Sequence, residues 1–213
     1  MLRNSLLAIQ ALLGMTIVLE GTPNPRLCSV LIAATMRLAQ TMGLHRKNQD
    51  PTLTEVQVEQ QRRVFWIAYF LDKDINLRTG QPLAQDDGDL DVELPSETIS
   101  NLPPYNNSTN TINFFNLRIG LAIIQGQVYR RMYSVKAANQ SKAAQSFAAH
   151  ELNAMLAAWR DSIPIDFEEI RQPLFKLQSL QTFCIRSFCV LFMLVVWLLS
   201  INHFREIMAL RLL

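Results

Sequence analysis

Apolar residues recur at steps of three and four along most of this chain, and this spacing constrains the fold more than any other feature. The step is typical of one face of an α-helix. Helices are predicted over residues 4–20, 27–42, 54–78, 115–133, 148–163 and 174–210. No run of strict alternation is long enough for a sheet, and Val, Ile and Thr do not cluster between turn signals. The pattern predicts an all-α fold, an irregular domain of about six helices.

Local signals set some of the helix ends. Gly43 follows the helix over 27–42 at the place where a left-handed C-terminal cap would lie. Two overlapping capping boxes, Thr52 with Glu55 and Thr54 with Gln57, precede the helix over 54–78. The start of that helix is therefore ambiguous by two residues.

The longest interruption of the helical pattern covers residues 79–110. It contains four prolines and an Asn-rich end, so it is predicted to be an extended connection. It is also acidic, and no Lys or Arg occurs between Arg78 and Arg118. The acidic residues are Asp86, Asp87, Asp89, Asp91, Glu93 and Glu97. We expect a solvated acidic connection whose carboxylates pair with arginines of the helix over 54–78.

Length and charge exclude several classes of protein. The chain has 213 residues and a formal charge of +2, which fits about one domain and is too balanced for a nucleic-acid-binding surface. Its three cysteines cannot make an even disulfide framework, so a reducing compartment is expected. The basic residues Arg62, Arg63 and Lys73 alternate with acidic ones, which favours a solvated helix face over direct DNA contact.

A calcium site would be one use of the acidic connection. Asp87, Asp89 and Asp91 have the spacing of the first three ligands of a calcium loop. However, Val92 replaces the turn glycine that should follow, and Ser100 stands where the bidentate acid is expected. We therefore expect no calcium here.

Zinc binding and catalysis have equally little support. His45, His150 and His203 are far apart in sequence, and Cys184 and Cys189 have no partner pair. The chain has only seven glycines, no G-x-S-x-G elbow and no phosphate-binding loop. We expect no metal site and no enzyme. A small-molecule-converting enzyme with a helical pocket remains a weaker alternative.

Two uncharged stretches, residues 5–19 and 187–201, could be mistaken for targeting or membrane segments. The first lacks a convincing signal-peptide cleavage site, and the second is shorter than the roughly 20 residues that a span requires. A buried core helix is the favoured interpretation of residues 187–201, and a signal peptide is not expected at residues 5–19. A helical membrane-associated protein with short apolar spans is the main alternative.

Four sequence blocks in a fixed order resemble one known family. They are A-A-T-M-R-L-A-Q-T-M-G-L-H-R at 33–46, R-R-V-F-W-I-A-Y-F-L-D-K at 62–73, T-G-Q-P at 79–82 and D-L-D-V-E-L-P at 89–95. Together they resemble the fungal-specific transcription factor domain, the middle regulatory region of fungal zinc binuclear-cluster transcription factors, of the xylanolytic-activator type. The resemblance extends more faintly over residues 4–180.

The family resemblance implies structural roles for eight residues. Gly43, Leu44 and His45 match the helix-ending turn, Arg63, Trp66 and Asp72 match the long helix, and Gly80 and Pro82 match the turn after it. Gly43 can adopt the positive φ that ends a helix, Trp66 can bury a large apolar surface, and Asp72 can accept hydrogen bonds from an arginine or a loop amide. All are expected to determine the fold and none to be catalytic.

The resemblance also implies a function. It predicts a regulatory domain over residues 1–180, without the N-terminal part of the family, that modulates transcription by RNA polymerase II. The implied partners are other segments of the parent factor, co-regulator proteins and a small-molecule effector, and the implied location is the nucleus. Zinc is expected only in the family's six-cysteine cluster, so no cofactor is expected in this chain.

Two features depart from the family. Gln81 replaces the usual arginine of the T-G-x-P turn, which removes any ion pair made there. Residues 181–213 are nearly apolar throughout, where the family has an amphipathic helix. We expect this tail to be either a divergent buried helix or the product of a truncation or an unspliced intron in the gene model.

Overall fold

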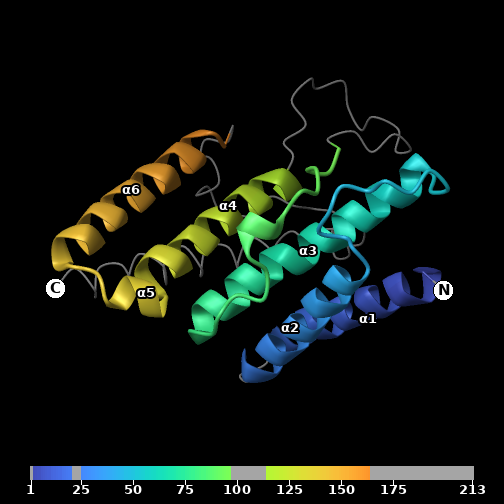
Figure 1. Cartoon of the computed structure of the whole chain (residues 1–213), viewed down its shortest axis with the longest axis horizontal. Coiled ribbons are helices and arrows are strands. Elements are labelled where there is room, and N and C mark those ends of the chain that lie inside the picture. Colours follow the sequence, from blue (N-terminus) through green and yellow to red (C-terminus); the bar gives the residue numbers. More distant parts are fainter. Residues whose placement is uncertain (1, 21–24, 97–113, 164–213) are drawn as a thin grey trace, which may run out of the picture. The chain divides into compact units, whose positions relative to one another are not determined.

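The computed structural model describes residues 2–20, 25–96 and 114–163 (Figure 1). The α-helices are α1 (Leu2–Glu20), α2 (Pro25–Thr41), α3 (Glu55–Thr79), α4 (Phe114–Val128), α5 (Val135–Ala138) and α6 (Lys142–Asp161). These ranges contain no strand, so the all-α prediction is confirmed.

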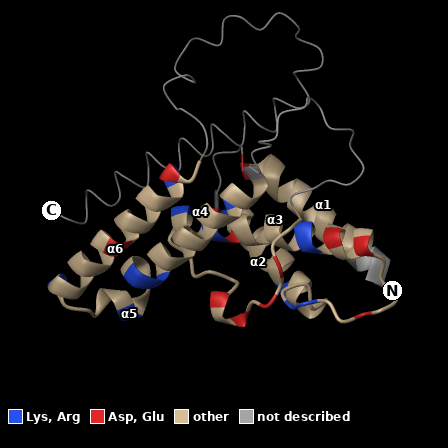
Figure 2. Cartoon of the chain, turned by 90° about the horizontal axis from the view of Figure 1, so that it is seen from above, with Lys and Arg blue, Asp and Glu red and all other residues tan. Residues whose placement is uncertain are grey.

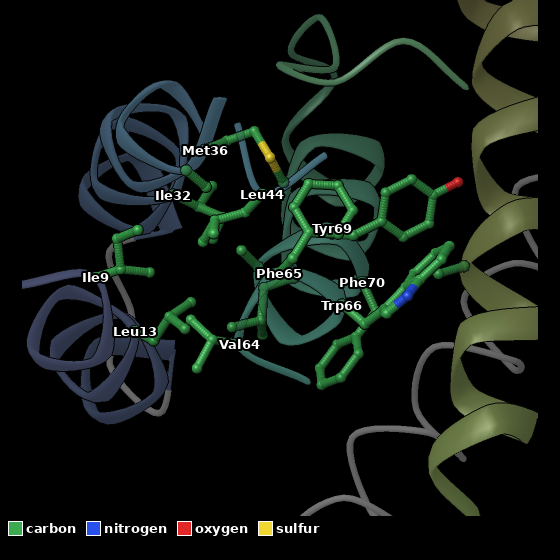
Figure 3. Packing of buried hydrophobic residues seen from close by; sticks show 14 of the residues in the cluster. Ile9, Leu13, Ile32, Met36, Leu44, Val64, Phe65, Trp66, Tyr69 and Phe70 are labelled. Atoms are coloured by element: carbon green, nitrogen blue, oxygen red, sulfur yellow. The ribbon is translucent and has the colours of Figure 1, made fainter. Parts of the chain in front are cut away.

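Helices α1 and α2 pack together on one side of α3, and α4 lies on its other side (Figure 1). Ile9 and Leu13 from α1 and Ile32 and Met36 from α2 point toward Phe65 of α3 (Figure 3). All five side chains are buried. The helix predicted over 27–42 is therefore present, but its core face is that of Ile32 and Met36. The apolar stripe that begins at Leu27 is exposed or only partly buried, so its predicted orientation is wrong.

Local hydrogen bonds set both ends of α3, which spans Glu55–Thr79 where 54–78 was predicted. The Thr54 hydroxyl accepts from the backbone N–H of Gln57, and the Gln57 side chain accepts from the backbone N–H of Thr54. This capping box is therefore the one of the two candidates that forms. Thr52 instead donates from its hydroxyl to Asp50 at 2.7 Å. Gly80 ends the helix with a φ of 67°.

Residues 81–96, which we call the 81–96 segment, run without an α-helix from the end of α3. They contain one short 3-10 turn, Asp87–Asp89, which begins where the Asp86 carboxylate accepts from the backbone N–H of Gly88 at 2.8 Å. The prediction of an extended connection is confirmed for this segment apart from that turn. The rest of the predicted connection, from residue 97, lies outside the described residues.

The helix predicted over 115–133 is interrupted in the structure. α4 ends at Val128, and Tyr129–Tyr133 form a π-helical turn. The backbone N–H of Ser134 donates to the carbonyl of Tyr129 at 2.9 Å. A four-residue helix, α5, that was not predicted follows it. α6 then begins six residues before the predicted start at 148, and its Trp159 indole donates to the carbonyl of Leu117 at 2.9 Å, which fixes α6 on α4.

Gly126 allows α4 to approach the 81–96 segment closely. A Cβ atom there would lie 3.2 Å from a carboxylate oxygen of Asp87 and 3.4 Å from Cε of Lys73. We expect Gly126→Val to lower the free energy of unfolding by about 1–3 kcal/mol, because overpacking moves both charged groups. Urea unfolding followed by circular dichroism tests this. Gln127→Val, which places valine one position further along α4 and lowers helix propensity, is the control. A loss in Gly126→Val no larger than in Gln127→Val would contradict the close approach.

No described helix is long and apolar enough to cross a bilayer, which does not favour the membrane alternative. The predicted helix over 174–210, the apolar stretch 187–201 and the boundary at residue 181 lie outside the described residues.

Candidate functional site

The second half of α3 carries polar side chains inside the core. Asp72, Lys73, Asp74 and Asn76 are each at most 1% exposed. Burying a charge is costly unless it is paired and hydrogen-bonded, so each of these groups needs partners. The partners of these four groups identify the segments that α3 holds in place.

Asp72 holds the start of the 81–96 segment. Its carboxylate accepts the backbone N–H of Ala84 at 3.1 Å and of Gln85 at 3.2 Å, and it also accepts from the Asn76 side chain at 2.6 Å. Burial raises the pKa of Asp72, although the two backbone hydrogen bonds oppose this effect. The sequence allowed either an arginine or a loop amide as the donor to Asp72, and in the structure the donors from the 81–96 segment are loop amides.

Lys73 is fully buried next to Asp72 and points to the same segment. Its ammonium group donates to the carbonyl of Gln85 and lies 2.9 Å from the Asp87 carboxylate. The same nitrogen lies 4.7 Å from the ring centre of Tyr69, within the range of a cation–π interaction. Lys73 is therefore a structural cation and cannot reach DNA.

Asp87 joins three elements through one carboxylate. It accepts from the Tyr69 hydroxyl at 2.8 Å, pairs with Lys73, and contacts the Arg130 guanidinium of the π-helical turn. Burial and the charge of Asp87 together raise the pKa of Tyr69, so this phenol stays a donor. The expectation of a solvated connection is wrong for Asp87, whose side chain is 17% exposed, because side-chain cations already occupy it.

Asp74 points to the other side of α3 and connects it with α4. Gln125 of α4 donates to its carboxylate at 2.8 Å, and the Arg118 guanidinium lies 3.5 Å away. Arg78, one turn further along α3, lies 3.1 Å from Asp74 and also pairs with Glu20 at the end of α1. These contacts connect three helices through buried charges.

Glu20 provides a test of this buried network by pH. Burial raises its pKa above 4.5, and the charge of Asp74 adds to the effect. An acid whose folded pKa is raised favours the fold most below its unfolded pKa, and this contribution is lost as pH rises through the folded pKa. We expect the stability of the wild type to fall relative to Glu20→Gln as pH rises from about 4 to 7. Urea unfolding at both pH values measures the difference, and an unchanged or opposite difference would contradict the assignment.

The first half of α3 holds the far end of the 81–96 segment. The Trp66 indole donates to the backbone carbonyl of Glu93 at 2.8 Å. The Glu93 carboxylate lies 2.8 Å from both Arg62 and Lys47. The expected pairing of the acidic connection with an arginine of the long helix is confirmed at this position.

Arg63 and Glu59 complete the attachment. Arg63 pairs with Glu59 at 2.7 Å and donates to the carbonyl of Ser96 at 3.4 Å. Glu59 in turn accepts the backbone N–H of Ser96 at 3.1 Å. Both backbone groups of Ser96 are thus hydrogen-bonded to side chains of α3.

The turn after α2 contains three of the residues that the family resemblance singled out. Gly43 has a φ of 74°, as expected of a helix-ending glycine, and Leu44 is buried in the core. The backbone carbonyl of His45 accepts from the N–H of Asp91 at 3.0 Å, which joins this turn to the 81–96 segment. Burial lowers the pKa of His45, and the nearby Arg46 adds to this effect.

The turn after α3 contains two more of these residues, Gly80 and Pro82. Gly80 and Gln81 both donate backbone hydrogen bonds to the carbonyl of Asn76, at the C-terminal end of α3. The Gln81 and Pro82 side chains are exposed. Pro82 is therefore placed in the turn without a buried contact.

The remaining candidate residues do not come together. His45 and His150 lie on separate elements, and His203, Cys184 and Cys189 lie outside the described residues. The described part of the chain contains no group of three His, Cys, Asp or Glu residues that could hold a metal ion. Asp87, the first residue of the calcium-like spacing, instead pairs with protein cations.

A groove of about 720 Å³ opens between the end of α2, the turn after it and the 81–96 segment. Its lining is largely polar, and the acidic residues of the segment are seen in red in Figure 2. Gln85 is part of the lining, and its side chain accepts from Gln40 of α2 at 2.8 Å. Arg37 and Arg46 also line the groove. Two residues of the lining, Ala84 and Gln85, are held by the buried Asp72 and Lys73 of α3.

Several members of this site could not be recognised from the sequence. Tyr69, Gln85, Gln125 and Arg130 were not singled out, because nothing in helical periodicity identifies a partner on another element. The helical spacing also gave no signal for Lys73. At about 100° per residue it lies nearly opposite the predicted apolar stripe of Val64 and Ala68, where an exposed charge is expected.

Comparisons with known proteins identify the family of the chain. The chain matches the fungal specific transcription factor domain over residues 2–161. It is 48% and 47% identical, over 171 residues, to the ABC-transporter-regulating transcription factors of Aspergillus oryzae and Aspergillus fumigatus. The match covers 78% of this chain and 19% of each relative, so the chain spans about a fifth of their length.

More distant relatives have related names. The Fusaridione A cluster transcription factor of Fusarium heterosporum is 34% identical over 131 residues, 61% of this chain and 25% of that protein. No solved structure matches the chain. The relatives are transcription regulators, a class of proteins that is usually nuclear. With three quarters of its length matched, the chain belongs to the fungal specific transcription factor domain family.

Proposed function

We propose that this chain is the regulatory domain of a fungal zinc-cluster transcription factor that controls transcription of ABC-transporter genes. The observation that carries the proposal is the 48% identity, over 78% of the chain, to a factor named for that activity. The domain would act through contacts with other segments of the parent factor, with co-regulators or with an effector, and without catalysis of its own.

DNA recognition would belong to another part of the parent factor. The chain has three cysteines, which cannot supply the six of a binuclear zinc cluster. Its basic residues on α3 are also occupied, since Arg62 and Arg63 pair with Glu59 and Lys73 is buried. Zinc and nuclear location are therefore proposed for the parent factor, and a fluorescent tag on that protein would test its location.

A domain exchange tests the proposed function. In the Aspergillus oryzae relative, the matching region would be replaced by residues 2–161 of this chain, and ABC-transporter transcripts would be measured. We expect the exchange to restore transcription that deletion of the region abolishes or deregulates. The matching region of the Fusarium heterosporum factor is the control, and the proposal fails if both exchanges behave alike.

The groove is the place where we propose that an effector acts. Arg37 lines it and makes no ion pair with any described residue, so its substitution should not disturb the fold. In the exchanged factor we expect Arg37→Glu to lower the ratio of induced to basal transcript about tenfold, the effect of one lost charged hydrogen bond. Arg26→Glu, on the same helix outside the groove, should leave it unchanged. An unaltered ratio in Arg37→Glu would place the effector elsewhere.

A further inference from the structure

The lining of the groove separates its charges onto two sides. The two arginines of the lining are Arg37, from α2, and Arg46, from the turn after it. Its three acidic residues, Asp86, Asp89 and Asp91, all come from the 81–96 segment. One side of the groove is therefore positive and the other is negative, so a ligand that touches both sides meets charges of opposite sign.

The donors on the positive side lack an acidic partner. Neither Arg37 nor Arg46 forms an ion pair with a described residue, and Arg46 uses only its Nε, which donates to Nε2 of His45 at 3.1 Å. Because that nitrogen accepts, the proton of the neutral His45 ring is on Nδ1, which is buried and has no hydrogen-bond partner among the described residues. Buried donors are normally satisfied. This side of the groove therefore suits a ligand carboxylate.

Two of the three carboxylates on the negative side also lack a partner. Asp86 lies 3.3 Å from the Arg130 guanidinium, whereas Asp89 and Asp91 are exposed and form no ion pair with a described residue. The backbone N–H of Asp89 donates to the carbonyl of Asp86 at 3.2 Å, and that of Asp91 to the carbonyl of His45 at 3.0 Å. The backbone thus holds both residues in place while their carboxylates remain available to a ligand ammonium group.

The rest of the lining offers apolar contacts. Leu83, Ala84 and Leu90 line the groove and are partly buried, and Ala84 and Leu90 also pack against the core. The volume of about 720 Å³ lies within the roughly 300–1,000 Å³ of small-molecule sites. A ligand with two negative ends would bring one of them next to Asp89 and Asp91. A ligand with two positive ends would bring one of them next to Arg37 and Arg46.

We propose that the groove binds a small zwitterion, with its carboxylate on the side of Arg37 and Arg46, its ammonium group on the side of Asp89 and Asp91, and an apolar body between the two. This inference rests on the proposed function, because it names the chemical class of the effector that we place in the groove. An amino acid with its charges at opposite ends of an apolar chain has this chemistry. A short apolar peptide with free ends has it too.

A two-dimensional NMR titration of the full 213-residue chain tests the class of ligand. The probes are aminohexanoate, adipate and diaminohexane, which have the same number of carbon atoms and differ in the charges at their ends. We expect aminohexanoate to bind with a dissociation constant of about 1 mM, as suits a few exposed charge contacts, and to shift the amide signals of Gly88 and Asp89. Adipate and diaminohexane should bind at least about tenfold more weakly.

Two further arms identify the source and the length of the ligand. Aminobutyrate and aminooctanoate vary the separation of the two charges, and the tightest of the three amino acids gives the separation that the groove fits. Leucylleucine represents the peptide source. Tighter binding of leucylleucine than of any of these amino acids would identify a peptide, and weaker binding would identify an amino acid.

Charge reversal tests whether the two sides of the groove recognise the two ends. Arg37→Glu should weaken aminohexanoate binding at least about tenfold and favour diaminohexane, whereas Asp89→Lys should favour adipate. Both side chains are exposed and form no ion pair with a described residue, so neither change should disturb the fold. Arg26→Glu and Asp161→Lys make the same charge changes outside the groove and should leave all three affinities unchanged.

Three results would overturn the proposal. One is the absence of binding by every zwitterion of the series at about 10 mM. Another is binding of adipate or diaminohexane as tight as that of aminohexanoate. The third is a preference among the probes that the charge reversals leave unchanged.

The domain exchange keeps this test separate from the test of the proposed function. If the exchange restores transcription and no zwitterion binds, the ligand class is wrong and the proposed function stands. If a zwitterion binds with the expected preference and the exchange fails, the ligand class stands and the proposed function is wrong.

Discussion

Changing Asp72 to alanine is expected to lower the free energy of unfolding by about 3 kcal/mol or more. The change leaves the backbone N–H groups of Ala84 and Gln85 and the Asn76 side chain without their buried acceptor. Each buried donor left unsatisfied costs about 1–3 kcal/mol, and removal of the carboxylate desolvation penalty returns only part of this. Urea unfolding of the full chain, followed by circular dichroism, measures the loss.

Asp89→Ala is the matched control for Asp72→Ala. Asp89 is exposed on the 81–96 segment and its change should have little effect on stability. If Asp72→Ala loses no more stability than Asp89→Ala, then Asp72 does not hold the segment.

Changing Lys73 to methionine should have a similarly large effect, about 3–5 kcal/mol. Methionine fills nearly the same volume but leaves the Asp87 carboxylate and the Gln85 carbonyl without the buried ammonium group. Breaking a buried ion pair by removing one partner typically has this cost.

A double-mutant cycle with Asp87→Leu identifies the interaction behind the effect of Lys73→Met. The second change should lessen the loss, because it removes the carboxylate that was left without the ammonium group. Full additivity of the two losses would show that the ion pair does not cause them.

The helix ends could be predicted where the signal is local. Thr54 and Gln57 bond to each other within one turn, and Gly43 and Gly80 supply positive φ at their own positions. Such features depend on neighbouring residues, so the sequence shows them directly. The interruption at Tyr129–Tyr133 could not be predicted, because a π-helical turn has no local sequence signal comparable to a cap or a glycine.

The site could be predicted only in part, because its contacts join residues that are far apart in the sequence. Asp72 and Trp66 were singled out through the family resemblance, but their partners are the 81–96 segment, twelve or more residues away. Lys73 resembled an exposed basic residue, and Asp87 resembled one member of a calcium loop. Only the fold places these two charges together and next to Arg130. Charge patterns along a sequence do not reveal which charges are buried together.

Hydrogen exchange of two backbone amides tests most directly whether the buried polar residues of α3 hold the 81–96 segment. We predict that the N–H groups of Ala84 and Gln85 exchange only through global unfolding, far more slowly than the exposed N–H of Gly88 in the same segment. In Asp72→Ala their exchange should approach that of Gly88. Rapid exchange of Ala84 and Gln85 in the wild type would contradict this account.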